Sequence, residues 1–274
     1  MWRLYCSEFK RLWGRKLTLL CAVAIPFIVA LSSKYYLENN LAFDVTSPQY
    51  TSISNFPVAA IQEQLIFSFN LIAIFLTVLC VTQEFKGGYM RMVLVRPIKR
   101  SHVFWAKYLV VLSSIFMLLV EYYVFSSIIG RIVFQRVDNV AVFYMDKLLD
   151  NPQMFIYSIK YYLYSFLTLS IITGVIFLIS TIGSNMVIST GVNLGFVLTS
   201  LVYPTVISVF LRSGNFNINK LRLLSITEIQ HKGLAAGLGM HSYLNSFMLL
   251  VLGVYGVLGI VLSYLIYKRK DQLI

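Results

Sequence analysis

Residues 65–81 read LIFSFNLIAIFLTVLCV, a stretch without a charged side chain in which Ser68, Asn70 and Thr77 are the polar interruptions. A helix needs about 17–25 mostly apolar residues to cross the hydrocarbon core of a bilayer, so this stretch predicts a membrane-spanning helix. Five further stretches have the same character. Together the expected spans are Leu17–Ser33, Leu65–Val81, Tyr108–Ile129, Tyr161–Ile182, Met186–Leu211 and Tyr243–Tyr267.

The composition agrees with a chain that lies largely in lipid. Of the 274 residues, 58% are hydrophobic and 12% are charged, whereas an ordinary soluble domain has about 25% charged residues. The net charge of +12 raises the question of nucleic acid, but a mean hydropathy of +0.76 favours a membrane protein that binds none. No remaining segment is long enough for a separate globular domain. We therefore expect an all-α integral membrane protein with one transmembrane domain, residues 1–274.

Lysines and arginines predict the orientation of the chain. They are dense in residues 1–16, 82–107 and 268–274, and sparser in the longer segments that alternate with these. Because cytoplasmic loops are enriched in Lys and Arg, we expect a multi-pass protein of the cell (plasma) membrane with both termini in the cytoplasm. A signal peptide is the alternative for the first span, but the long basic segment before it and the five spans after it favour an uncleaved anchor.

Residues 1–16 predict an amphipathic helix. Trp2, Tyr5, Phe9, Leu12 and Trp13 recur on one face of a helix, and the basic side chains lie off that stripe. Such a helix lies in the interface of the inner leaflet and binds anionic headgroups. The alternative is a plain basic segment that flanks the first span.

The segment 83–101, between the second and third spans, carries the most information. Gly87 and Gly88 allow a sharp turn, and Pro97 ends the short run that follows because proline cannot continue a helical hydrogen-bond ladder. We interpret this segment as a short cytoplasmic helix that lies along the membrane and docks a cytoplasmic protein. The alternative is an ordinary basic loop.

The order Glu84, Gly88, Leu94, Pro97, Arg100 and Lys107 resembles the degenerate E…G-T…L…P-x-x-R…K pattern of ABC-2 type transporter permeases. One departure is Tyr89, which stands where the family usually has a small hydroxyl residue. The layout of six spans with a basic N-terminal helix is similar too. The resemblance implies that residues 83–101 form a coupling helix that seats in a cytoplasmic ATP-binding cassette ATPase. The residues that it implies for this ATPase-coupling site are Glu84, Gly88, Met90, Arg91, Leu94, Arg96, Pro97 and Arg100, with Glu84 and Arg100 bracing the two ends.

The fifth span contains Gly191 and Gly195, a GxxxG spacing that lets helix backbones approach closely. Asn193 can add an interhelical hydrogen bond, and Pro204 can kink the outer half of the span. Packing within one subunit remains the alternative. Because the first and fifth spans of ABC-2 permeases meet across a dimer axis, the resemblance makes Gly191, Asn193, Gly195 and Pro204 candidates for a dimer and pore wall formed with a second permease copy, the same chain or a paralogue. The glycines of the sixth span, Gly253, Gly256 and Gly259, are expected to pack within one subunit.

The outer linker, residues 212–242, is too polar to span the membrane twice but carries regularly spaced isoleucines and leucines. The resemblance implies re-entrant half-helices here, and an ordinary outer loop is the alternative. Glu121 is the acidic residue deepest in a span, in the outer half of the third. It is either a functional intramembrane charge or the partner of Arg131 or Arg212.

Several catalytic motifs are missing. Without a GxxxxGK[ST] loop, the chain itself is expected to bind no cofactor, and ATP and Mg belong to the partner ATPase. No metal-ligand spacing is present. His241 and Asn245 match part of a CAAX-type membrane protease, whose other motifs are absent. We expect not an enzyme but a permease subunit of an ATP-driven exporter. An amphipathic or antimicrobial peptide is the preferred cargo, and a small hydrophobic drug the second. A CAAX-like protease and a non-transporting scaffold or sensor subunit are the alternatives.

Overall fold

The computed structural model describes residues 1–86, 99–145, 147–210, 216–239 and 242–269. Six helices in this part of the chain are long and apolar enough to cross a membrane, so the expectation of an all-α, multi-pass membrane protein is confirmed. Their segments are α2 (Lys16–Asn39), which continues as η1 (Asn40–Ala42); α3 (Phe56–Gln64) with η2 (Leu65–Phe69) and α4 (Asn70–Lys86); α6 (Arg100–Val133); α7 (Asn151–Ile182); α8 (Met186–Phe210); and α12 (Ser242–Arg269).

Several helices begin earlier than the apolar pattern predicts. The second spanning segment is helical from Phe56 instead of Leu65, the third from Arg100 instead of Tyr108, and the fourth from Asn151 instead of Tyr161. The extra turns pack on their neighbours, since Phe56, Val103 and Tyr157 in them are buried. Proline also stands in the first turn of α3 and of α7, where its missing N–H costs no helical hydrogen bond.

Helix α7 lies at the centre of the bundle and contacts α4, α8 and α12. It approaches α12 closely, since a Cβ atom added to Gly259 would lie 2.9 Å from the backbone carbon of Gly174. Gly256 faces Ile171 on α7, whereas a Cβ atom on Gly253 would meet no described atom within 4 Å. The expected packing within the subunit is therefore confirmed for Gly256 and Gly259, and Gly253 lies on the open face of α12.

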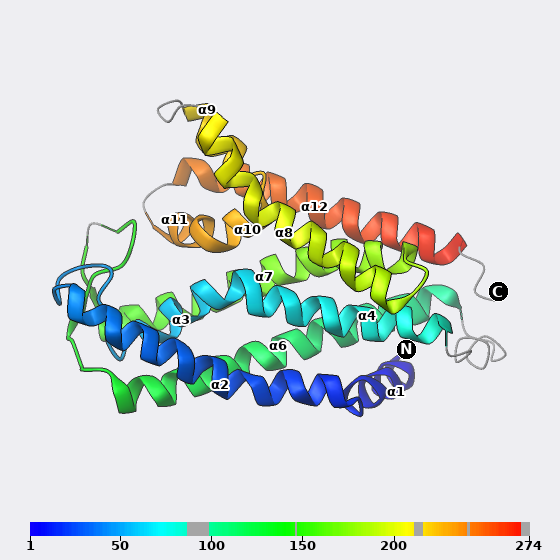
Figure 1. The fold of residues 1–274 in the computed structure, drawn as a ribbon, viewed down its shortest axis with the longest axis horizontal. Coiled ribbons are helices and arrows are strands. Elements are labelled where there is room, and N and C mark those ends of the chain that lie inside the picture. Colours follow the sequence, from blue (N-terminus) through cyan, green and yellow to red (C-terminus); the bar gives the residue numbers. More distant parts are fainter. Residues whose placement is uncertain (87–98, 146, 211–215, 240–241, 270–274) are drawn as a thin grey trace.

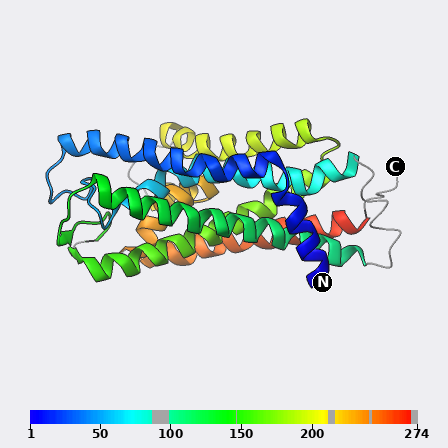
Figure 2. The ribbon, with the colours of Figure 1, turned by 90° about the horizontal axis from the view of Figure 1, so that it is seen from below.

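The bundle has two ends, which differ in what covers them. We call the end that carries α1 (Trp2–Trp13), the last turns of α4 and the first turns of α6 the basal end. Figure 2 shows α1 lying across this end, at an angle to the long helices. We call the opposite end distal; it carries residues 43–55 and 134–145 and the two-residue strands β1 (Asn139–Val140) and β2 (Leu149–Asp150).

The linker between α8 and α12 contains short helices: α9 (Phe216–Arg222), α10 (Ile226–Glu228), the π-helical turn η3 (Ile229–Gly233) and α11 (Leu234–Leu238). Segments η3 and α11 pack against η2 and α7 in the distal half of the bundle (Figure 1). Ile226, Ile229 and Leu234 are buried there, which explains the regular spacing of apolar residues in an otherwise polar linker.

Candidate functional site

A buried ion pair fixes α1 to the basal end of the bundle. Lys107 Nζ on α6 lies 2.8 Å from Glu8 Oε2 on α1, and each side chain is 1% exposed. Lys107 Nζ also donates to the carbonyl oxygen of Cys80 on α4, at 3.1 Å. Arg11 binds the other carboxylate oxygen of Glu8 at 2.9 Å. The three helices α1, α4 and α6 therefore meet at one ammonium group.

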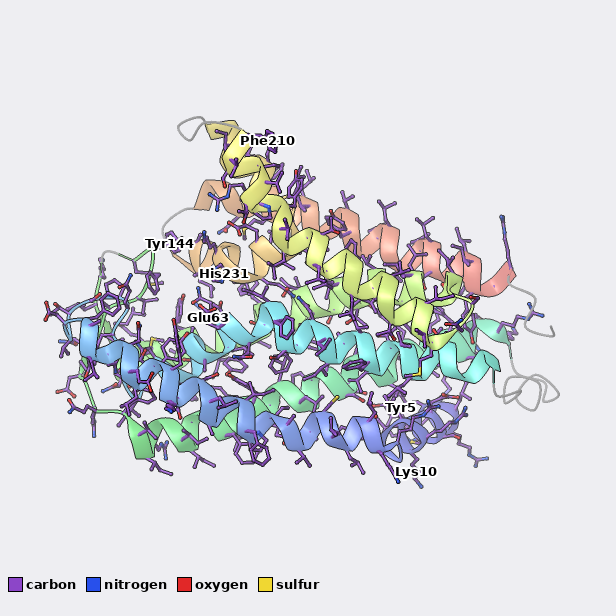
Figure 3. All side chains as sticks on the ribbon, in the orientation of Figure 1. Tyr5, Lys10, Glu63, Tyr144, Phe210 and His231 are labelled. Carbon is purple, nitrogen blue, oxygen red and sulfur yellow. The ribbon has the colours of Figure 1, made fainter. Side chains whose placement is uncertain are left out.

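The apolar stripe of the expected interfacial helix, α1, packs partly on protein. The Tyr5 hydroxyl donates to Ser113 Oγ at 2.8 Å, and the Trp13 indole donates to Ser114 Oγ at 3.1 Å, both on α6. Trp2, at the start of the stripe, is 75% exposed. Figure 3 shows Tyr5 at the bundle and Lys10 pointing away from it. Serines on α6 thus provide polar partners that a helical-wheel pattern of α1 does not reveal.

The first turns of α6 also connect to α12 and α7. The Arg100 guanidinium donates to the carbonyl oxygen of Lys268 at 3.3 Å. The Phe104 ring is buried and makes edge-to-face contacts with Phe177 on α7 and Tyr267 on α12, at ring-centroid distances of 5.2 and 5.5 Å. We call the group Glu8, Cys80, Arg100, Phe104 and Lys107 the basal block, because it joins α1, α4, α6, α7 and α12.

Most of the expected ATPase-coupling residues lie outside the described residues: Gly88, Met90, Arg91, Leu94, Arg96 and Pro97. Glu84 is in the last turns of α4, and the structure describes its backbone alone. Arg100 begins α6 and belongs to the basal block. The structure therefore places the two ends of the segment, at α4 and α6, within about two helical turns of the buried ion pair.

The residues singled out on α8 face in two directions. Gly191 and Gly195 are exposed, and Cβ atoms added to them would meet no described atom within 4 Å. Asn193 is buried on the other side and donates to Ser180 Oγ on α7 at 3.0 Å, so the expected interhelical hydrogen bond is made within the subunit. Pro204 is also buried. The open glycine face is thus separate from the face that carries Asn193.

Glu121 is half-buried on α6. It forms no ion pair with Arg131 or with any other residue in the described ranges, and Arg212 lies outside them. Asn245, half of the protease-like pair, donates to the carbonyl oxygen of Gly237 at 2.9 Å, and His241 is not among the described residues.

Sequence reasoning missed a buried amide pair in the middle of the bundle. Asn70 and Gln230 are 0% exposed, and each donates to the other's carbonyl oxygen, at 2.7 and 3.2 Å. Asn70 directly follows the π-helical turn η2, and Gln230 lies within η3. Short π-helical turns inside α-helices occur frequently at functional sites. The possible signal in the sequence was Asn70 itself, a polar residue in the middle of a charge-free span.

A cavity of about 390 Å³ opens at the distal end. Residues from α2, α3, η3 and the distal loops line it. Its aromatic lining consists of Tyr35, Tyr36, Phe43, Phe143 and Tyr144, and its charged or titratable lining of Glu63, His231 and Lys232. Figure 3 shows Glu63, Tyr144 and His231 gathered at this end of the molecule. We call this space the distal cavity.

Taken together, the fold and these sites define an all-α, multi-pass membrane protein. Its basal end is joined by an ion pair, hydrogen bonds and ring contacts between helices, and its distal end carries a polar cavity. The chain belongs to the family described as "Protein of unknown function (DUF2705)", whose model matches residues 19–273. It is also similar to "Uncharacterized protein YhcI" of Bacillus subtilis (strain 168). The two are 23% identical over 248 residues, which cover 86% of this chain and 73% of the relative.

Proposed function

We propose that this chain is the permease subunit of an ATP-driven exporter in the cell (plasma) membrane. A cytoplasmic ATP-binding cassette ATPase would dock on residues 83–101, and two permease copies would enclose the path of the cargo. The density of Lys and Arg at the basal end supports a cytoplasmic location for this end and for both termini.

The basal block carries the proposal. A rigid-body switch needs contacts that transmit a local displacement to whole helices. The segment 83–101 joins α4 to α6, and Lys107 binds both α4 and α1 within two turns of Arg100. Phe104 extends the connection to α7 and α12. An ATPase that moves this segment would therefore move five helices together.

The open face of α8 supports pairing with a second permease. Gly191 and Gly195 leave a smooth helix surface that no described residue of the same chain covers. Small residues at such a spacing let two membrane helices approach closely. Two copies that meet along α8 would place the buried face of each α8, with Asn193, toward its own α7.

The short helices of the linker support the proposal that the transport path closes on the distal side. We propose that α10, η3 and α11 form the re-entrant element, since α7, η2 and α12 cover their backbone on the protein side. For the cargo we favour an amphipathic or antimicrobial peptide over a small hydrophobic drug. Glu121 stays a candidate for a functional charge within the membrane, because no described residue neutralises it.

The proposal is tested by copurification with an ATP-binding cassette protein encoded next to this chain. We expect Met90→Asp with Leu94→Asp to abolish copurification and ATP-dependent transport of a fluorescent amphipathic peptide into inverted vesicles. The matched control is Leu41→Asp with Val45→Asp, two exposed apolar residues at the distal end, which should leave copurification intact.

Three outcomes would point elsewhere. Persistent copurification and transport in the Met90 and Leu94 variant would refute the docking assignment. ATPase stimulation without transport would favour a scaffold or sensor subunit. Proteolytic activity that depends on His241 and Asn245 would favour the membrane protease.

A further inference from the structure

The distal cavity combines aromatic rings with a carboxylate that lacks a partner. Glu63 on α3 lines the cavity and makes no hydrogen bond or ion pair with any described residue. The cationic lining residue, Lys232, has a partner of its own, because its ammonium group lies 3.8 Å from Glu228 Oε1. Glu228 also binds Arg222 at 3.0 Å. Glu63 is therefore the carboxylate of the described lining that has no ion-pair partner.

Aromatic side chains come to the cavity from two parts of the chain that are far apart in the sequence, residues 35–43 and 143–144. Tyr35 and Tyr36 lie at the end of α2 with their rings in edge-to-face contact, at a centroid distance of 5.3 Å. Phe43 follows in the next loop, and Phe143 and Tyr144 come from the loop after α6. Rings from several directions around a small space are the arrangement that binds organic cations, because the face of each ring is electron-rich.

The backbone holds Tyr144 in place at the cavity. Tyr144 has a φ of 64°, a conformation that non-glycine residues rarely adopt. Gly239, at the end of α11, packs directly against it, and a Cβ atom on Gly239 would lie 2.5 Å from the Tyr144 carbonyl oxygen. A glycine is therefore required at 239 for this loop to meet α11. Unusual backbone conformations held by close packing occur preferentially at ligand-binding sites.

The turn η3, which lines one side of the cavity, also carries Gln230 of the buried amide pair. His231 lines the cavity and directly follows Gln230, and the Gln62 amide donates to the His231 carbonyl oxygen at 3.2 Å. Nδ1 of His231 is buried and has no hydrogen-bond partner among the described residues. A ligand in the cavity would thus contact the same π-helical turn that Gln230 joins to α4.

We propose that the distal cavity binds an organic cation, with an ammonium group against the Glu63 carboxylate and the surrounding rings. A cavity of about 390 Å³ accepts a quaternary ammonium headgroup or a lysine-like side chain. The inference deepens the proposed function. It rests on that function in one respect, because we take the bound cation to be part of the exported cargo. Binding itself requires neither the ATPase nor transport, so the two are tested separately.

Three probes of equal shape and different charge test the site on the full chain in nanodiscs, by saturation-transfer NMR. The first is choline, the second is its uncharged isostere with carbon in place of nitrogen, and the third is the tert-butylacetate anion. We expect choline to bind about tenfold more tightly than the isostere, because the cation adds its attraction to Glu63 and to the rings. The anion should show no saturable binding. Equal binding of choline and the isostere, or preferential binding of the anion through His231 and Lys232, would overturn the proposal.

Variants locate the site. Glu63→Gln keeps the shape of the side chain and should weaken choline binding about tenfold, without changing the affinity for the isostere. The matched control is Glu38→Gln, an exposed glutamate at the same end that does not line the cavity. Phe143→Leu keeps apolar bulk and should weaken choline binding by about two- to fivefold. Wild-type affinity in Glu63→Gln would refute the site, whereas choline binding without any transport of cationic peptide would refute the proposed function alone.

Discussion

Lys107 on α6 and Glu8 on α1 form an ion pair, 2.8 Å between Nζ and Oε2, that is almost completely removed from solvent. The desolvation of two charges largely offsets their attraction, so such a pair adds little net stability. The pair contributes to specificity, because the buried Lys107 ammonium has Glu8 as its acidic partner and would be costly to bury without it. The pair therefore fixes where the N-terminal helix sits, next to the segment that we propose as the ATPase-docking site.

We expect Lys107→Met to destabilise the protein by up to about 3 kcal/mol, because it leaves the buried Glu8 carboxylate with Arg11 as its remaining cationic partner. The measurement is the midpoint of unfolding in detergent. Lys10→Met, on the outward face of α1, is the control and should leave the midpoint unchanged. A double variant, Glu8→Leu with Lys107→Met, should recover most of the loss, since it removes both charges. A double variant that is less stable than Lys107→Met would show that the pair itself is strongly stabilising.

The Asn70–Gln230 pair predicts non-additive substitutions. Asn70→Leu or Gln230→Leu should each cost about 1–3 kcal/mol, because either change leaves one buried amide without its hydrogen-bond partner. Together they should cost less than the sum of the two by about 1 kcal/mol. Unfolding in detergent measures all three, and Gln153→Leu, on the exposed start of α7, is the control. Strict additivity would mean that the two amides do not depend on each other.

The close contact between α7 and α12 predicts different responses at two glycines of the same helix. Gly259→Val would force side-chain atoms into the α7 backbone and should destabilise the protein by about 1–3 kcal/mol. Gly253→Val occupies open space on the same helix and serves as the matched control. The measurement is the midpoint of thermal unfolding of each variant, compared with that of the wild type. Equal stability would contradict the close approach at Gly174.

The open glycine face of α8 predicts a change in assembly without a change in fold. Gly191→Leu with Gly195→Leu should leave the unfolding midpoint close to wild type, because nothing described lies within 4 Å of either position. The same variant should shift the protein from dimer to monomer, as measured by cross-linking in native membranes. Gly253→Leu, on the open face of α12, controls for a general effect of bulk. If the α8 variant still forms the dimer, these glycines do not lie in the dimer interface.

Cysteine labelling tests the orientation. With Cys6 replaced by serine and the buried Cys21 and Cys80 retained, Lys99→Cys should resist a membrane-impermeant maleimide on intact cells. Arg136→Cys, exposed at the distal end, should react. The reason is the enrichment of Lys and Arg at the basal end. External labelling of Lys99→Cys would place the segment 83–101 outside the cell and exclude any contact with a cytoplasmic ATPase.

The number of spans was predictable from apolar length, whereas the helix ends were not. Runs such as Leu65–Val81 must be helical in lipid, because no water is available to satisfy the backbone. The earlier starts at Phe56 and Asn151 depend on packing against neighbouring helices, which a hydropathy pattern does not contain. The packing of Gly256 and Gly259 within the subunit was predicted correctly. The role of the segment 83–101 stays a prediction, since most of its residues lie outside those described.

By itself, the sequence determined that this chain is a multi-pass membrane protein, with six stretches long and apolar enough to cross the bilayer. The reason is that the cost of burying charge and backbone in hydrocarbon is set locally by composition and length. Tertiary structure alone decided which polar residues meet. Glu8 and Lys107 are far apart in the chain, as are Asn70 and Gln230 and the residues around Glu63. Such pairs are invisible to a sequence pattern, because their energy depends on distances and burial that exist only once the helices have packed.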